Sequence, residues 1–360
     1  MNKSKLTILD PKYDNFYHSF RMVFDLNGDD YTFYSDKDHI GQVDCLICNH
    51  FYHPNIGIDP ADIIKKYNYR KSFFLDIKHN SENQIELLNS RCDASLHDFT
   101  ITNAIDFNIT NDKIIYYDFL FNRTKAYYLG YQWQATDLWY YSSKLSYQIP
   151  SHSLPELKSK LYVSPNNSRL GERKFRSKLV DILLTKYSNL GYIGDISRGI
   201  KLHCQLNCID ATSVDDLYSR ASTFLIGGYD PPHTEYYKDT FISIYAETIE
   251  YGNSFAPTEK TFDPLIKGHF ILPFSNCGFI TYIKNTYGFQ FPNFIDYSYD
   301  SIEDDNTRFY YYSQELERLM NLDISLWKEH WANNQDIIKH NQQIFYDRPY
   351  HRIDFSQYLK

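Results

Sequence analysis

The sequence predicts an α/β protein with two halves that face each other across a cleft, followed by a helical tail. Three observations lead to this fold class. The chain has 360 residues, which corresponds to about two domains of ordinary size. Short apolar segments alternate with helix-forming segments, a pattern typical of a parallel sheet covered by helices. From Thr307 onwards the chain is strongly helical, as in the segment LERLMNLDISLWKEHW.

The first predicted domain covers residues 1–150. Its strands are apolar and β-branched runs between polar turns, predicted at Ser19–Leu26, Gln42–Asn49, Ser72–Ile77, Phe99–Thr102 and Lys113–Tyr117. Asp59 and Pro60 predict a helix over residues 61–67, because Asp is a good N-cap and Pro fits the first turn. Glu82–Asn89 is a second predicted helix. Because Gly28-Asp29 is a turn signal, a hairpin is an alternative for the opening section.

The second predicted domain covers residues 151–315 and follows a Ser- and Pro-rich linker, Ser143–Pro155. It opens with a strand at Lys160–Ser164. The next predicted helix carries apolar residues at helical spacing over Phe175–Tyr187, and Gly191 is expected to cap its end.

The later part of the second domain is the most regular. Its predicted elements are a helix at Ile209–Leu225, a strand at Phe241–Glu247, a helix from Thr258 to Lys267, a strand in HFILPF and a helix in CGFITYIKNTYGF. Thr258 is the predicted N-cap of the helix that runs to Lys267, and Gly268 is expected to end that helix. Gly288 is expected to end the helix in CGFITYIKNTYGF. The tail, residues 316–360, either packs back on the first domain or pairs with a second subunit.

Charge and hydropathy narrow the class of protein. The net charge of −8 argues against a general affinity for nucleic acid, which needs clustered Lys and Arg. The opening MNKSKLTILDPKYDNF has no apolar stretch long enough for a signal peptide. No segment approaches the roughly 18 apolar residues of a membrane span, so we expect a cytoplasmic protein.

The cysteines offer a possible metal site that we do not favour. Cys45 with Cys48, and Cys204 with Cys208, have a spacing that four zinc ligands can adopt. Cys45 and Cys48 lie in the apolar run VDCLICN, a predicted strand, where residues three apart face opposite sides. We therefore interpret these cysteines as buried structural thiols.

The first candidate site is the cationic stretch NSRLGERKFR. It brings four cations together in a chain that is acidic overall: Arg169, Arg173, Lys174 and Arg176. A strand followed by a cationic loop and a helix start suits a phosphate group, because backbone N–H groups and the helix dipole favour an anion. The alternative is a solvated basic face of an amphipathic helix.

The second candidate site is the predicted helix start at Thr258, Glu259 and Lys260. A cation is normally unfavourable in the first turn, so Lys260 is easier to explain if an anionic ligand lies in front of it. The Glu259 carboxylate pairs well with the two hydroxyls of a ribose. The alternative is an ordinary first-turn Glu beside a solvated Lys.

The stretch ETIEYGNSFAPTEKTFDPLIKGHFILPFSN resembles the donor-binding motif of α1,3-fucosyltransferases. There a strand ending in Glu precedes a loop and a Thr-Glu-Lys turn that opens a helix. The matching residues here are Glu247, Thr258, Glu259 and Lys260. The preceding LYVSPNNSRLGERKFRSKLVDIL resembles the strand–loop–Arg–helix segment of the same family, with Arg176 as the preferred match for its arginine and Arg173 as the alternative.

The chain is more similar still to a looser set of uncharacterised glycosyltransferase-like proteins from phages, giant viruses and bacteria. Their motifs appear here as Thr258–Lys260, Gly288-Phe289 and IDYSYD at Ile295–Asp300, followed by Arg308. Order and spacing carry this resemblance, which covers about residues 160–315. For a viral chain, the expected location becomes the host cytoplasm.

The resemblance implies a GT-B fold, with two Rossmann-like domains across a cleft, and a hexosyl- or fucosyltransferase-like enzyme. The C-terminal domain would hold a nucleotide-sugar donor, and the acceptor would be a glycan or another hydroxyl compound. Inversion at the anomeric carbon is implied, with no obligatory metal and no cofactor.

The resemblance also implies a role for each site residue. Arg176 or Arg173, together with Lys260, would neutralise the diphosphate leaving group. Glu259 would hold the ribose, and Glu247 would stabilise positive charge on the sugar ring.

An inverting transferase also needs a base for the acceptor hydroxyl. The family places a Glu just after a strand of the first domain, and the comparable SFFLDIKHNSENQ offers Asp76, His79 and Glu82. We select Asp76 and Glu82 as catalytic candidates.

The remaining acidic residues are interpreted as structural. Asp296 and Asp300, four apart in a turn-like segment, are predicted not to bind metal. The run Glu303-Asp304-Asp305 is predicted to open a helix, where carboxylates favour the dipole.

Two other functions stay open. One is a non-catalytic carbohydrate- or nucleotide-binding protein on a decayed transferase fold. Three intact site charges, on Arg176, Glu259 and Lys260, argue against such decay. The other is a DNA-modifying glycosyltransferase, which needs a cationic surface beside the cleft and is disfavoured by the net charge.

Overall fold

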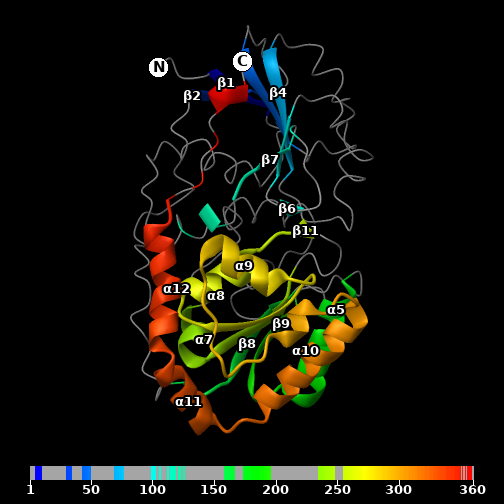
Figure 1. The fold of residues 1–360 in the computed structure, drawn as a ribbon, viewed down its shortest axis with the longest axis vertical. Helices are drawn as coiled ribbons and strands as arrows, with labels where there is room; N and C mark the ends of the chain where they lie inside the picture. The colour runs from blue at the N-terminus through cyan, green and yellow to red at the C-terminus, as the bar shows by residue number, and fades with distance from the viewer. Residues whose placement is uncertain are drawn as a thin grey trace, which may run out of the picture. The chain divides into compact units, whose positions relative to one another are not determined.

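The computed structural model (Figure 1) defines two main sheets, of six and four strands, and the helices around the second of them. The residues it describes are 5–9, 30–34, 43–49, 69–76, 99–102, 105–106, 112, 114–118, 121–122, 125, 158–166, 173–195, 234–247, 254–349, 351, 353 and 355–358. The predicted strand at 19–26, the predicted helices at 61–67, 82–89 and 209–225, and the predicted linker at 143–155 lie outside these ranges.

The chain folds into two compact units. Unit 1 consists of Met1–Arg123 and Tyr350–Lys360, and unit 2 of Thr124–Pro349. Most of the tail therefore belongs with the second sheet, whereas the sequence treated residues 316–360 as a separate segment. The reason is apolar burial, because Leu316 and Trp327 lie in the core of unit 2.

Unit 1 contains a six-stranded sheet in the order β2-β1-β3-β4-β5-β7, with every neighbouring pair parallel. Its strands are β1 (Lys5–Leu9), β2 (Asp30–Tyr34), β3 (Val43–Asn49), β4 (Tyr69–Asp76), β5 (Phe99–Thr102) and β7 (Ile114–Tyr116), and β6 is Ile105–Asp106. Four of them match predicted strands, and β1 was missed. Strand β2 pairs with β1 in parallel, and the segment before Gly28-Asp29, which the alternative hairpin would pair with β2, lies outside the described residues.

The end of the chain packs into unit 1. Phe73 and Phe99 stack with ring centroids 5.2 Å apart, and Tyr358, in the short η8 helix (Phe355–Tyr358), contacts both rings. Asn122 and His351 exchange two hydrogen bonds, of 2.8 and 3.0 Å. Aromatic packing and these bonds fix the last residues on the first sheet.

Unit 2 contains a parallel four-stranded sheet in the order β12-β10-β8-β9. The strands of this sheet are β8 (Tyr162–Asn166), β9 (Gly191–Asp195), β10 (Ile242–Ala246) and β12 (Phe270–Phe274), and the short β11 (Ser254–Phe255) lies outside the sheet. Its helices are α5 (Lys174–Lys186), α7 (Thr234–Asp239), α8 (Glu259–Ile266), α9 (Phe279–Tyr287), η7 (Ser298–Ser301), α10 (Asp305–Met320), α11 (Ile324–Asn333) and α12 (Gln335–Asp347). The predicted elements around β10, α8, β12 and α9 are confirmed.

The predicted cap at Gly191 is wrong. Helix α5 ends earlier, at Lys186, and Gly191 begins β9, a strand that the sequence analysis missed. A Cβ atom at Gly191 would lie 2.4 Å from the Tyr162 carbonyl oxygen. Glycine is needed here because β9 passes close to β8, and not because a helix ends.

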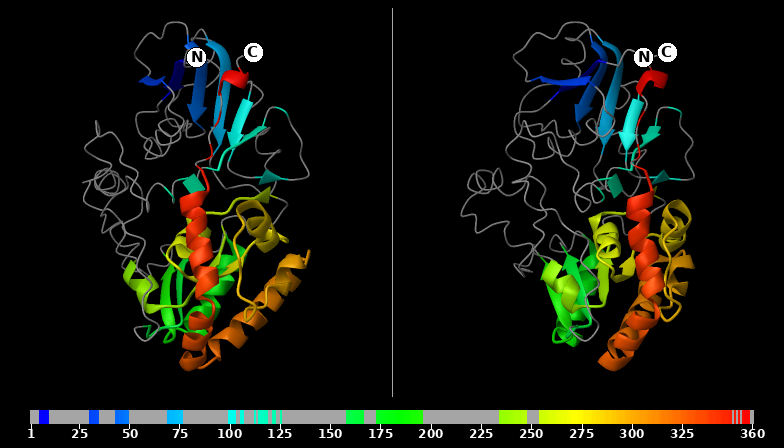
Figure 2. Two further views of the ribbon diagram at one scale, coloured as in Figure 1. Left: turned by 60° about the vertical axis from the view of Figure 1, so that its left-hand side comes forward. Right: turned by 90° about the vertical axis from the view of Figure 1, so that its left-hand side faces the viewer.

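Helices pack on both faces of the second sheet. On one face, the rings of Phe175, Phe274 and Phe309 join α5, β12 and α10, with centroids 4.8 to 5.2 Å apart. On the other side, α12 runs beside α8 (Figure 2). Gln342 Nε2 of α12 donates to the Ile266 carbonyl of α8 at 2.9 Å. Much of the abundant aromatic surface is therefore buried in the core.

A buried lysine closes the amino edge of this sheet. The Lys158 ammonium donates to the carbonyls of Tyr237 (3.1 Å), Lys238 (3.1 Å) and Thr240 (2.6 Å), at the end of α7. The ring of Trp331 lies 5.2 Å from the same nitrogen. A cation at a helix C-terminus is favourable. Lys158 therefore ties the end of α7 to β8, the strand that follows Lys158 in the sequence.

We predict that Lys158→Met lowers the free energy of unfolding by about 2 kcal/mol, because it removes a buried donor that binds three carbonyls at the end of α7. Urea denaturation measures the loss. Lys160→Met is the matched control, since the Lys160 ammonium makes an exposed bond to the Asn189 carbonyl. The control should change stability by less than about 0.5 kcal/mol. Equal losses in both variants would contradict the role of Lys158.

Lys158 also predicts a pH dependence. Burial lowers its pKa from 10.5 to about 7, against the raising effect of Asp239. Above pH 7 the unfolded chain therefore holds this proton more tightly than the folded protein, and stability rises with pH. The expected gain is on the order of 2 kcal/mol between pH 7 and 9. His269 titrates below this window, because burial lowers its pKa well below 6.5.

The measurement is the unfolding free energy of wild type and Lys158→Met at both pH values. The difference between the two proteins should widen at pH 9. A difference that stays constant would show that Lys158 does not titrate in this window.

Candidate functional site

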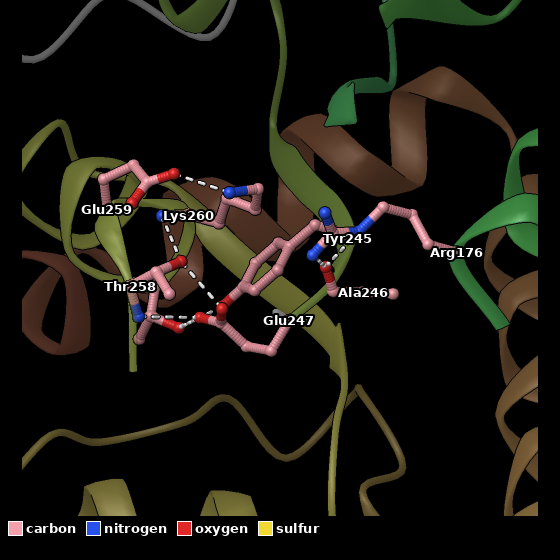
Figure 3. Close-up of polar contacts among 8 residues, drawn as sticks. Arg176, Tyr245, Ala246, Glu247, Thr258, Glu259 and Lys260 are labelled. Carbon is pink, nitrogen blue, oxygen red and sulfur yellow. Dashed lines mark hydrogen bonds and ion pairs between the residues drawn. The ribbon is translucent and has the colours of Figure 1, made fainter. Parts of the chain in front are cut away.

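The site lies at the carboxyl edge of the second sheet, where the ends of parallel strands and the starts of helices meet. Glu247 directly follows β10, and Thr258 directly precedes α8. Figure 3 shows that Glu247, Thr258, Glu259 and Lys260 lie together, with Arg176 reaching the same strand end. The second domain's predicted donor residues therefore come from two helices and one strand end.

Glu247 is fully buried, with 0% of its surface exposed. Its Oε1 accepts from the Thr258 backbone N–H (3.0 Å) and from the Thr261 hydroxyl (2.6 Å). Its Oε2 accepts from the Thr258 hydroxyl (2.7 Å). These bonds hold the carboxylate against the first turn of α8, where the helix dipole favours a negative charge.

The start of α8 is a capping box divided between two segments. In an ordinary capping box, a Glu at the third helical position accepts from the N–H of the N-cap residue. Here that position holds Thr261, and Glu247, from the end of β10, accepts from the Thr258 N–H instead. Thr258 completes the cap by accepting from the Lys260 N–H at 3.2 Å. Thr258 is therefore the N-cap, as predicted.

Glu259 and Lys260 form an ion pair in the first turn of α8. The Lys260 ammonium lies 2.5 Å from Glu259 Oε1. The Lys260 side chain is 14% exposed and the Glu259 side chain 21%. The cation that looked unfavourable at a helix start is thus balanced by its neighbour. Both side chains still reach solvent, unlike Glu247, and remain suited to contact a ligand.

Arg176 projects from α5 to the end of β10 and is also fully buried. Its Nε and Nη2 donate to the Ala246 carbonyl at 3.0 and 2.7 Å. The guanidinium therefore binds the residue that directly precedes Glu247 (Figure 3). In this position Arg176 fixes α5 against β10 and brings its positive charge to the carboxyl edge.

The other cations of the first candidate site lie at the start of α5. Arg173 is the N-cap residue and is half-buried, and Lys174 is exposed and donates to Asn306 Oδ1 at 2.9 Å. Arg169 lies outside the described residues. The cationic stretch is therefore a helix start, as predicted, and Arg173 is more accessible than Arg176.

The helix starts at this edge differ in which groups accept hydrogen bonds from their first backbone N–H groups. At α9, Asp300 accepts from the N–H groups of Ile280 (3.0 Å) and Thr281 (3.2 Å), and at α8 Glu247 takes the same role. Burial raises the pKa of Asp300, and these bonds oppose the rise. In the described part of α5, the first turn holds no acidic residue and its N-cap side chain makes no capping bond. The start of α5 is therefore the one best suited to an external anion.

The acidic residues near η7 accept hydrogen bonds from backbone N–H groups. Asp296 Oδ1 accepts from the Ser298 N–H at 2.8 Å, and Asp300 caps α9. Asp304 is the N-cap of α10 and accepts from the Thr307 N–H at 2.7 Å. In the described part of the chain, His, Cys, Asp and Glu side chains form no group of three or more that could hold a metal ion.

Arg308 is a buried residue for which the sequence predicted no role. Its Nε donates to the Ser275 carbonyl (2.9 Å), just after β12, and its Nη1 donates to the Ile302 carbonyl (2.7 Å). Its Nη2 pairs with Asp305. Arg308 therefore holds the end of β12 to the start of α10, a contact that no local pattern in the sequence signals.

The candidate bases of the first domain remain predictions. Asp76 is the last residue of β4, at the carboxyl end of the first sheet, and its side chain lies outside the described part of the structure. His79 and Glu82 also lie outside it. No described helix combines the length and hydropathy of a membrane span.

No protein-family profile matches the sequence, and a search of curated proteins finds no significant relative. The solved structures found to resemble the chain are sugar transferases. They are crystal structures of α1,3-fucosyltransferase: one with GDP-fucose (TM-score 0.44, 13% identity), one with GDP (0.44, 14%) and a third (0.42, 15%). These comparisons cover 98, 98 and 97% of this chain and 93% of each other chain. At such low scores the likeness assigns no role to any residue, so the roles proposed below rest on the geometry just described.

We predict that Glu247→Gln lowers the free energy of unfolding by about 2 kcal/mol. The amide keeps the size of the side chain but removes the charge at the start of α8 and turns one acceptor into a donor. Urea denaturation measures the effect.

Glu259→Gln is the matched control, because it makes the same change in a partly exposed ion pair, worth less than about 1 kcal/mol. If the two variants lose stability equally, Glu247 is not the cap of α8.

Proposed function

We propose that this protein is a GT-B glycosyltransferase that moves a sugar from a nucleotide-sugar donor to a glycan or another hydroxyl acceptor. The observation that carries the proposal is the convergence of Arg176 from α5, and Glu259 and Lys260 from α8, on the end of β10. Charged groups of both signs at the carboxyl edge of a parallel sheet suit a ligand that carries both a diphosphate and a ribose.

The diphosphate is assigned to the start of α5. That helix start has no acidic residue in its first turn and carries Arg173, whereas α8 and α9 receive carboxylates from Glu247 and Asp300. Arg173 is half-buried and can contact phosphate oxygens directly, while the buried Arg176 adds its charge from behind. Lys260, in the first turn of α8, would supply a further positive charge.

The ribose is assigned to Glu259. Its carboxylate accepts hydrogen bonds and is partly exposed beside Lys260. A diol donates two hydrogen bonds to such a group. On donor binding, Lys260 would then exchange part of its contact with Glu259 for the phosphate.

The proposed chemistry is transfer with inversion and without metal. As the bond between the anomeric carbon and the phosphate oxygen breaks, negative charge grows on the diphosphate, and Arg173, Arg176 and Lys260 stabilise it. The acceptor oxygen forms the new bond and gives its proton to a base, for which Asp76 and Glu82 are the candidates. Because Glu247 is fully buried, we assign it to holding α8 rather than to contact with the sugar.

Thermal-shift measurements with GDP, UDP, CDP, dTDP and ADP test the donor site. One of these nucleotides should stabilise the protein by about 2.7 kcal/mol at a hundredfold excess over its dissociation constant. The shift should be lost in Lys260→Met and in Arg173→Gln, which remove charges from partly exposed side chains. Lys186→Gln is the control, because it removes a charge from the opposite, exposed end of α5.

A shift that survives in both site variants would place the nucleotide elsewhere. No shift with any of the five would favour the non-catalytic carbohydrate-binding protein, which needs no donor. Release of the same nucleoside diphosphate from its sugar conjugates then identifies the donor sugar.

A further inference from the structure

Two hydroxyl groups continue the contacts of Glu247 into the core. The Tyr245 hydroxyl lies 2.8 Å from Thr261 Oγ1, which in turn lies 2.6 Å from Glu247 Oε1. Tyr245 and Glu247 are two apart along the end of β10 and so face the same side, toward α8. All three groups are buried, and Figure 3 shows the aromatic ring beside Glu247 and Thr258.

The direction of these hydrogen bonds follows from their chemistry. A carboxylate only accepts, so Thr261 donates its single hydroxyl proton to Glu247. Thr261 can therefore only accept from Tyr245, which makes the phenol the donor. Burial, followed by the charge of Glu247, raises the pKa of Tyr245 well above its ordinary value, so the phenol keeps the proton that it donates.

Thr261 is the third residue of α8, so no turn of the helix precedes it to offer a carbonyl to its hydroxyl. The hydroxyl of Thr261 points out of α8 to Glu247, and Tyr245 supports that orientation. We propose that Tyr245 and Thr261 are positioning residues, which act through Glu247 to fix the first turn of α8 and thereby the donor-contacting Glu259 and Lys260. The donor part of this inference rests on the proposed function, and the helix part does not.

The position of Lys260 explains how the contacts of Tyr245 and Thr261 with Glu247 would affect ligand binding. Lys260 is the second residue of α8, and its N–H is bound by Thr258, which is itself held by Glu247 through both its N–H and its hydroxyl. If Glu247 turns, the cap loosens and the Lys260 ammonium is spread over more positions. Ligand affinity then falls without loss of any group that touches the ligand.

The test uses Thr261→Val, which removes the hydroxyl at constant size, and Tyr245→Phe, which removes only the phenol oxygen. Thr261→Ser keeps the hydroxyl and should restore wild-type behaviour. The first measurement is hydrogen exchange of the Thr258 and Lys260 amides in the full chain. Exchange should become roughly three- to tenfold faster in the Val and Phe variants, the size expected for one lost hydrogen bond.

The amides of Ile280 and Thr281, bound by Asp300, provide the internal control, because α9 has the same kind of carboxylate cap but no contact with Thr261 among those described. Their exchange should not change. Equal acceleration at α8 and α9 would mean general destabilisation and would overturn the proposal, as would wild-type exchange at α8 or failure of the Ser variant to restore it.

The second measurement is the dissociation constant of the nucleoside diphosphate that stabilises the wild type. It should rise by roughly three- to tenfold in the Val and Phe variants, with the Ser variant near wild type. Unchanged affinity alongside faster α8 exchange would overturn the positioning role.

If the wild type binds none of the five nucleotides while exchange at α8 responds as expected, the proposed function fails and the hold of Tyr245 and Thr261 on α8 stands. The two failures are therefore distinguishable.

Discussion

The arrangement of helices at the carboxyl edge of the second sheet depends on the hydrogen bonds that the buried Glu247 carboxylate accepts. A charge removed from water is costly unless hydrogen bonds surround it, and three donors from Thr258 and Thr261 reach this one. Those donors belong to α8, while the carboxylate belongs to the chain leaving β10. Strand and helix therefore keep one relative position, because any shift would leave a charge without partners in the core.

Two other contacts extend the same constraint across the edge. Arg176 ties α5 to β10 through the Ala246 carbonyl, and Arg308 ties α10 to the end of β12 through the Ser275 carbonyl. Carboxylates close the starts of α8 and α9, and cations gather at the start of α5. Negative and positive side chains are therefore separated along this edge, and the proposed diphosphate site is at its positive part, the start of α5 and Lys260.

Agreement between sequence and structure follows the range of the interactions involved. The strand at Phe99–Thr102 and the helix ends at Gly268 and Gly288 were predictable, because apolar alternation and left-handed backbone (φ 79° and 86°) are local requirements. Gly191 was misread, because its requirement is the approach of Tyr162 from a distant strand. The tail was predicted as helical, and only apolar burial assigned it to the second sheet.

By itself, the sequence determined the class of fold, the caps of α8 and α10, and the cluster of cations at the start of α5, since each depends on neighbours within a few residues. The tertiary structure decided which of these charges is accessible. Arg176 and Glu247 are buried and act as supports, whereas Arg173, Glu259 and Lys260 remain in reach of a ligand. The physical reason is that burial and the division of the α8 cap between two segments arise only when β10 and α8 pack together.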